Sequence, residues 1–239
     1  MAPVLIKEVT RRTNIKQIWQ AIYTAGTLIP RPFSEATYYH RDINVKKLLD
    51  IRFSYLPSGR SKSLHMKLLS IPKETTIENI RPMVKKDSKK VHSLVNGYLE
   101  NLDVSFHFNK EEIQHFFLPR EKVMYSFVVT DPDTDEITDF FSFYSLPSSV
   151  LDNSKYNTLY AAYSYYMVPG KHSLLEIMKN ALILAKKYKF DVFNALDIME
   201  NKDVFETLHF GKGSGNLFYY LYNWSLPKLE SNRLGAVLV

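Results

Sequence analysis

Apolar residues recur along this chain at helical spacing in some stretches and in alternation with polar residues in others. Val91, Val95 and Leu99, for example, lie on one face of a helix, because residues four apart meet on the same side. Residues that commonly cap helices, such as Asn109 and Ser173, precede several of these stretches. Helices are therefore predicted over residues 3–13, 45–50, 87–102, 110–117, 173–188 and 201–208.

Shorter apolar runs bounded by turn residues predict strands. Asp131-Pro132-Asp133, for example, has the composition of a turn and separates two such runs. Strands are predicted over residues 18–23, 64–69, 123–129, 137–146, 158–168, 191–196, 216–223 and 234–239, with a further strand left open near 80–83.

Between residues 72 and 80 the sequence becomes polar and irregular. This predicts a boundary between a segment of residues 1–72 and a domain of residues 73–239. The elements predicted after the boundary follow the order helix, helix, three strands, helix, strand, helix, strand. That order resembles the acyl-CoA-dependent N-acetyltransferase fold, a mixed α/β architecture, although a shared fold does not fix an activity.

The composition is that of a globular protein with a sizeable core, with 45% hydrophobic and 23% charged residues among 239. No apolar run approaches the roughly 18 residues of a transmembrane helix, and the first residues lack a signal-peptide pattern. The absence of cysteine excludes disulfides, a thiolate nucleophile and cysteine-ligated metal. We therefore expect a cytoplasmic protein without a membrane span.

The segment "FGKGSGNLFYYLYNW", residues 210–224, combines three glycines with a lysine and a dense aromatic run. A phosphate-binding loop requires a helix after its glycines, whereas an alternating strand pattern follows here. Although the net charge is +6, the basic residues are spread along the chain, so no nucleic-acid partner is expected. Residues 211–215 are predicted to form a tight turn between a helix and a strand.

Other candidate sites are few. The seven histidines show no metal-ligand spacing, so no metal is expected, and His40 stands out only because it follows two tyrosines. In acyl-CoA-dependent N-acetyltransferases, the loop after the fourth strand cradles the CoA pyrophosphate. The matching "VPGKHS", residues 168–173, has one lysine and one glycine, which makes a poor cradle.

Several motifs resemble those of the N-myristoyltransferases (glycylpeptide N-tetradecanoyltransferases). They are "APVLIKEVTRR", "AIYTAG", "YYHRDIN", "TDFFSFYSLPS", "AAYSYY", "FDVFNALDIMEN" and "FGKGSGNLFYYLYNW". They occur in the family's order and cover essentially the whole chain. The resemblance implies transfer of myristoyl from myristoyl-CoA to the N-terminal glycine of proteins, without metal or a covalent enzyme intermediate.

By this resemblance, the whole enzyme consists of two N-acetyltransferase-like halves. The first binds myristoyl-CoA and supplies a backbone oxyanion hole, and the second supplies most of the peptide groove. Residues 1–72 would be the tail of the first half and residues 73–239 the second half. The family's E-[IV]-N-F-L-C-x-H-K signature is absent, so most of the myristoyl-CoA site would be missing and the chain alone is expected to have little or no activity.

The resemblance also assigns site residues. The family's general base is its C-terminal carboxylate, which corresponds to Val239, and Ala2 and Pro3 match the edge of the CoA site. The family's K-F-G-x-G-D-G reads "HFGKGSG" here, so Ser214 replaces an acid that attracts basic substrate residues. The remaining peptide-binding residues would be Thr24, Tyr38, His40, Phe53, Tyr144, Ser164, Asn194 and Leu196.

Two alternatives remain open. The chain could be a non-catalytic peptide-binding module, which would bind N-terminal glycine peptides without transferring an acyl group. It could also be a half-length protein whose partner is either the missing N-terminal half or a second copy of the chain. In the last case the face between halves would be apolar and would favour a dimer.

Overall fold

The computed structural model describes residues 1–151 and 153–238. Its centre is an eight-stranded mixed sheet with the order β1-β11-β2-β10-β9-β6-β5-β3. Strands β9 and β10 run parallel, and the other neighbouring pairs are antiparallel. The strands are β1 (Ala21–Ala25), β2 (Ser34–Asp42), β3 (Ile80–Pro82), β5 (Met124–Thr130), β6 (Ile137–Ser145), β9 (Ala161–Val168), β10 (Val192–Leu196) and β11 (Gly211–Tyr222).

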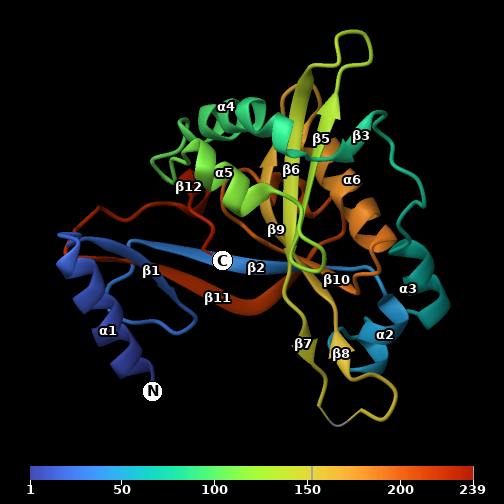
Figure 1. Ribbon diagram of the computed structural model, residues 1–239. Coiled ribbons are helices and arrows are strands. Elements are labelled where there is room, and N and C mark those ends of the chain that lie inside the picture. Colours follow the sequence, from blue (N-terminus) through green and yellow to red (C-terminus); the bar gives the residue numbers. More distant parts are fainter. Residues whose placement is uncertain (152, 239) are drawn as a thin grey trace.

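Helices cover both faces of this sheet (Figure 1). On one face, α4 (Ser88–Leu99) and α5 (Lys110–Phe117) pack into a first core cluster that includes Phe117 and Phe140. On the other face, α6 (Leu174–Lys187) packs into a second cluster with Phe141 and Phe143. Because neighbouring residues of β6 point to opposite faces, this single strand contributes to both cores.

Local sequence explains where these helices begin. Asn109 accepts a hydrogen bond from the backbone of Glu112, and the Glu112 side chain accepts one from the backbone of Asn109. Ser173 and Glu176 form the same reciprocal capping box at the start of α6. The helices predicted over 110–117 and 173–188 are thus confirmed, and α6 forms the crossover that parallel β9 and β10 require.

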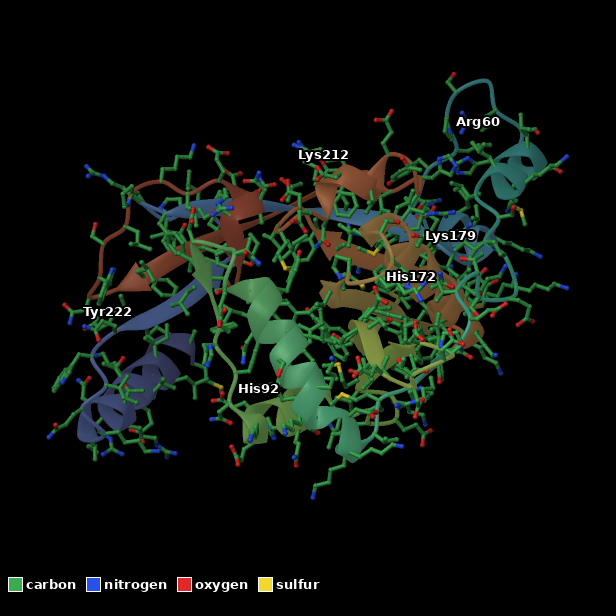
Figure 2. All side chains as sticks on the ribbon, turned by 90° about the horizontal axis from the view of Figure 1, so that it is seen from above. Arg60, His92, His172, Lys179, Lys212 and Tyr222 are labelled. Atoms are coloured by element: carbon green, nitrogen blue, oxygen red, sulfur yellow. The ribbon has the colours of Figure 1, made fainter. Side chains whose placement is uncertain are left out.

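The remaining elements are shorter or peripheral. Both views show α1 at the β1 end of the sheet, where its described residues include none that are buried (Figures 1 and 2). Two small sheets pair β12 with β4 and β7 with β8. These elements are α1 (Ala2–Ile15), α2 (Val45–Asp50), α3 (Lys62–Leu68), α7 (Lys202–Phe205), β4 (Val104–Ser105), β7 (Ser148–Ser149), β8 (Thr158–Leu159), β12 (Leu234–Gly235) and 3₁₀ turns at Lys85–Asp87 and Ser231–Arg233.

Four strand predictions need correction. Residues 64–69 form most of helix α3 instead of a strand, because Ser61 caps the segment by accepting from Leu64 N. The first strand lies at Ala21–Ala25 instead of 18–23, and β2 was not predicted. The predicted strand over 158–168 is divided into β8 and β9. Of the described residues in the predicted last strand, only Leu234–Gly235 pair with a neighbour.

The glycine-rich residues 211–215 are not the predicted turn. They form the first part of β11, which pairs with β2, and the register shifts between Lys212 and Asn216. An irregular strand suits glycine, because it has no side chain to hold the regular pleat. Lys212 projects to the surface from this part of β11 (Figure 2).

The mixed α/β fold class is confirmed. After β3, the predicted order of helices and strands is present, including the strand that was left open near residue 80. Strands β1 and β2, from residues 1–72, join the same sheet as the later strands. The division at residue 72 stays a prediction.

Candidate functional site

Four side chains form a row across one face of the sheet. The register places His40 of β2 opposite Asn194 of β10, and Asn194 beside Tyr163 of β9. Tyr163 in turn lies opposite Tyr144 of β6. Directly paired residues of neighbouring strands point to the same face, so four strands contribute to one surface.

A pocket of about 430 Å³ lies along this row. We call it the tyrosine pocket, and its lining consists of Tyr38, His40, Tyr144, Leu146, Tyr163, Gly215 and Leu238. Its walls contain aromatic rings and aliphatic side chains but no carboxylate and no lysine or arginine among the described residues. Such a lining suits the neutral backbone of an extended chain.

The His40 ring is fixed on both sides. Its Nδ1 donates to Asn194 Oδ1 at 2.6 Å, and Asn194 is buried. The backbone of Gly213 packs against the Nε2 edge so closely that a Cβ at residue 213 would collide with the ring. The Phe53 ring meets the imidazole edge-on, with 5.4 Å between centroids. His40, Asn194 and Phe53, predicted separately, therefore form one contact group.

The tyrosines of the pocket also support one another. The rings of Tyr144 and Tyr163 stack with 5.4 Å between centroids, and Tyr38 meets Tyr163 edge-on at 6.1 Å. Burial, and secondarily the Tyr163 hydroxyl, raises the pKa of Tyr38, and burial raises the pKa of Tyr144. Both phenols therefore stay neutral at physiological pH and can donate hydrogen bonds to a ligand.

Other predicted residues do not line the pocket. Ser164 lies opposite Phe143, whose ring belongs to the core on the other face, and its buried hydroxyl has no partner among the described residues. Leu196 lies opposite Tyr38 and is part of the first core. Thr24 lies on β1, and exposed Ser214 precedes Gly215 in the irregular part of β11.

Three of the predicted site residues lie at the two ends of the chain. Ala2 and Pro3 begin helix α1 and are exposed. Val239, the predicted base, lies outside the described residues. Its predecessor Leu238 lines the tyrosine pocket, which brings the described part of the C-terminal segment to the site.

Sequence reasoning missed Tyr163, Leu146, Gly215 and Leu238. Tyr163 could have been suspected from alternation, because Tyr163 and Tyr165 share a spacing of two in a predicted strand. Nothing in the local sequence relates Leu238 to Tyr144, since their approach depends on how distant segments pack.

A larger pocket, of about 480 Å³, lies between the end of α4, the start of α7 and residues 230–233. Its lining includes Asp197, Glu200, Asp203 and Glu230, and it contains none of the predicted site residues. We therefore centre the candidate site on the smaller pocket, where predicted residues converge.

Backbone N–H groups of the junction at residues 168–173 bind a carboxylate of the protein itself. The buried Asp139 carboxylate accepts from the backbone N–H of Gly170 at 2.7 Å and of His172 at 2.9 Å. It also accepts from Thr138 Oγ1 and His172 Nδ1. Backbone N–H groups that could have met a phosphate at the start of α6 thus already serve an internal anion.

Within residues 1–151 and 153–238, no group of three or more His, Asp or Glu side chains is arranged to hold a metal ion. In the same residues, no helix is long and apolar enough to cross a membrane.

Comparison with known proteins decides the family. A family model described as "Myristoyl-CoA:protein N-myristoyltransferase, C-terminal domain" matches residues 50–235, and the corresponding N-terminal model matches residues 1–36. The chain belongs to the N-myristoyltransferase family. The resemblance seen in its motifs is thereby confirmed.

Relatives of this N-myristoyltransferase chain come from distant organisms. A glycylpeptide N-tetradecanoyltransferase of Plasmodium falciparum is 46% identical over 239 residues, and glycylpeptide N-tetradecanoyltransferase 2 of Bos taurus is 46% identical over 238. A crystal structure of Saccharomyces cerevisiae N-myristoyltransferase with bound myristoyl-CoA matches all of this chain with a TM-score of 0.94 and 35% identity. The chain spans 58% of the Plasmodium relative, 48% of the bovine one and 62% of the yeast structure.

Proposed function

We propose that this chain supplies the peptide-binding part of an N-myristoyltransferase, which transfers myristoyl from myristoyl-CoA to the N-terminal glycine of proteins. The observation that carries the proposal is the row of His40, Asn194, Tyr163 and Tyr144 along the tyrosine pocket. The reaction is inferred from family membership, and the row of side chains is the proposed binding place of the acceptor peptide.

The pocket chemistry suits a peptide that begins with glycine. Its neutral phenols can donate to peptide carbonyls, and the stacked rings of Tyr144 and Tyr163 offer a flat wall to an extended backbone. The requirement for glycine as the first residue is proposed from family membership, since the relatives are glycylpeptide N-tetradecanoyltransferases.

In the proposed reaction, the neutral glycine nitrogen attacks the thioester carbonyl of myristoyl-CoA and the C–S bond breaks. The proton that the new amide nitrogen loses neutralises the departing CoA thiolate. The amine must first lose a proton, which at pH 7 costs about 1–1.5 kcal/mol for a group with a pKa near 8. The carboxylate of Val239 is the proposed base. Holding the amine next to it compensates for its low basicity, because the transfer becomes intramolecular.

The myristoyl-CoA side of the reaction requires more than this chain. We propose that Ala2 and Pro3 lie at the edge of the CoA site, with residues 1–72 acting as the tail of a first half and residues 73–239 as the second. Assayed by itself, the 239-residue chain is expected to show little or no transfer. The absence of cysteine is compatible with the reducing cytoplasm as its compartment.

Ser214 affects the proposed substrate preference. It is exposed in β11 two residues from exposed Lys212, and this local charge is positive. A preference for basic residues downstream of the glycine is therefore not expected at this position. Substituting Ser214→Asp should restore such a preference, seen as tighter binding of a Lys-containing peptide than of its Ala counterpart.

The test is a titration of the chain with a glycine-initiated peptide and with the same peptide acetylated at its N-terminus. The proposal expects tighter binding of the free amine, and indifference to acetylation would refute the groove. A parallel assay with myristoyl-CoA addresses catalysis, and robust turnover by the chain alone would contradict its expected inactivity. Binding without any transfer in the presence of the remaining family sequence would favour a non-catalytic peptide-binding module.

A second candidate is self-association, which is suggested by exposed apolar side chains on helix α1. Helix α1 exposes Val4, Leu5, Ile6 and Val9, and an unburied apolar face of this kind favours a partner. The partner would be the first half of the enzyme or a second copy of the chain. Light scattering at high concentration separates the two, since a monomer would exclude the second copy.

A further inference from the structure

The C-terminal segment, residues 234–238, runs through the interior of the protein. Leu234 is 0% exposed, Ala236 1% and Val237 4%. Its strand pairing is short, because the register of β12 with β4 ends at Gly235. The position of the residues that follow must therefore depend on other contacts.

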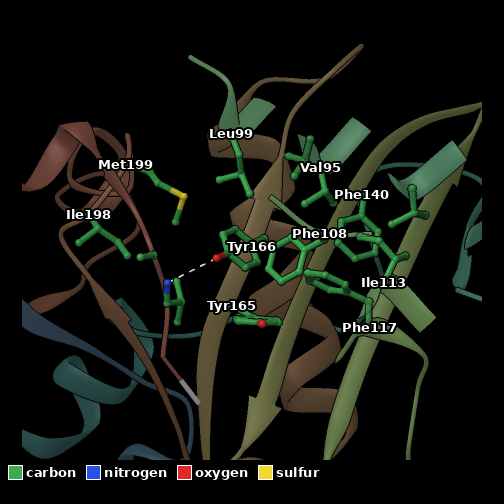
Figure 3. Close-up of a cluster of buried hydrophobic side chains, with 14 of the residues drawn as sticks. Val95, Leu99, Phe108, Ile113, Phe117, Phe140, Tyr165, Tyr166, Ile198 and Met199 are labelled. Atoms are coloured by element: carbon green, nitrogen blue, oxygen red, sulfur yellow. Dashed lines mark hydrogen bonds between the residues drawn. The ribbon is translucent and has the colours of Figure 1, made fainter. Parts of the chain in front are cut away.

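Tyr166 provides such a contact. Its hydroxyl donates to Gly235 O at 2.9 Å and accepts from Val237 N at 3.4 Å. One side chain thus bonds the backbone on both sides of Ala236, just beyond the point where strand pairing ends. Figure 3 shows the Tyr166 hydroxyl directed at the backbone nitrogen of this segment.

The tyrosine itself has little freedom. It is 0% exposed, and its ring packs against Phe108 and Phe117 with centroid distances of 5.8 Å to each (Figure 3). Its backbone N–H also donates to Ser142 Oγ. A hydroxyl fixed in this way can define where the segment lies, because a rotamer change would disrupt close packing.

Gly235 shows how closely the segment is packed. A Cβ at residue 235 would lie 2.5 Å from Leu102 Cδ1 and 2.9 Å from Leu99 Cδ2. The backbone therefore passes directly against Leu99, at the end of α4, and against Leu102. The Tyr166 hydroxyl bonds the same stretch at Gly235 O and Val237 N. These contacts together restrict where the segment can lie.

That path ends at the wall of two pockets. Leu238 lines the tyrosine pocket and also an adjoining pocket of about 290 Å³, together with Phe106, His107, Phe108, Glu112, Phe116, Tyr165 and Val237. We propose that Tyr166 is a positioning residue for the tyrosine pocket, because its hydroxyl fixes the C-terminal segment that carries Leu238. The inference rests on the proposed function, in which this pocket takes the acceptor peptide.

The experiment compares Tyr166→Phe with Tyr220→Phe. Tyr220 is a matched control: it is 3% exposed and its hydroxyl accepts from the backbone nitrogen of Ile29, away from the C-terminal segment. Hydrogen exchange of residues 234–238, peptide affinity and Tm are measured for both variants. In Tyr166→Phe, the Val237 amide loses its acceptor and Gly235 O loses its donor, so exchange of the Val237 amide is expected to speed up by about tenfold.

The peptide affinity of Tyr166→Phe should fall by about fivefold or more, since a mobile Leu238 leaves the pocket less often preformed. Tyr220→Phe, which loses one buried hydrogen bond, should also lower Tm but leave Val237 exchange and peptide affinity unchanged. Equal exchange in the two variants, or equal loss of affinity, would overturn the proposal. If the wild-type chain binds no glycine peptide, the proposed function fails, while the exchange data still decide whether Tyr166 anchors the segment.

Discussion

Replacing Asp139 with alanine would remove the carboxylate on which the β9–α6 junction converges. In the folded protein this group is 0% exposed and accepts four hydrogen bonds, from Gly170 N, His172 N, Thr138 Oγ1 and His172 Nδ1, at 2.7–2.9 Å. Hydrogen bonds to a charged group contribute about 1.5–3 kcal/mol each, but they are not additive within one network. We expect Asp139→Ala to lower the free energy of unfolding by about 3–5 kcal/mol.

Part of this contribution should depend on pH. Burial alone would raise the pKa of Asp139, but the hydrogen bonds from Thr138 and His172 outweigh it and hold the pKa below its ordinary value. A carboxyl group whose pKa is lower in the folded than in the unfolded state stabilises the protein at any pH above its unfolded-state pKa, about 3.9. This contribution is lost as the pH falls through the folded-state pKa. The difference between wild type and Asp139→Ala should therefore shrink below about pH 4.

Urea unfolding followed by circular dichroism, at pH 7 and at several values down to pH 3, measures both effects. Asp131→Ala is the comparison, because Asp131 also accepts backbone N–H bonds, from Asp133 and Thr134, and pairs with Lys171 of the junction, but its carboxylate is only partly buried. Asp131→Ala should lower the free energy of unfolding by only about 1 kcal/mol. If Asp139→Ala cost no more than Asp131→Ala, the junction would not be organised by the buried carboxylate.

Substitutions at three further positions test the core and the pocket. Gly213→Ala should weaken binding of a glycine peptide by about tenfold in calorimetric titration, because the added Cβ would displace the His40 ring; unchanged affinity would mean that the ring position is unimportant. Tyr144→Ala should weaken binding similarly while Tyr144→Phe retains most of it, since the stacked ring is kept; equal losses would assign the effect to the hydroxyl instead. Leu234→Ala should lower the free energy of unfolding by about 2–5 kcal/mol in urea, because the side chain is 0% exposed, and a cost below about 1 kcal/mol would contradict the buried path of the C-terminal segment.

The parts of the fold that sequence predicted well are those in which local signals agree. At α5 and α6, a capping residue, a glutamate three residues later and apolar spacing all indicate the same start. In α3 they conflict: Leu64, Met66 and Leu68 alternate as in a strand, and only the Ser61 cap indicates a helix. A segment this short leaves periodicity ambiguous.

Strand β2 escaped prediction for a different reason. Its residues alternate between the pocket face and the second core, but both sets contain tyrosine and a basic residue, so no apolar–polar alternation is visible. The site was predictable as single residues through the family resemblance. Their arrangement was not, because His40, Asn194, Tyr163 and Tyr144 meet through the register of strands far apart in sequence.

The proposed function depends on the acceptor peptide occupying the tyrosine pocket. The decisive measurement is of intermolecular NMR contacts between the glycine Hα of a bound peptide and the side chains of the chain. Contacts to the rings of Tyr144 and Tyr163 are expected, and they should be lost when the peptide is acetylated. Contacts to Tyr98 and Glu200, in the larger acidic pocket, would contradict it.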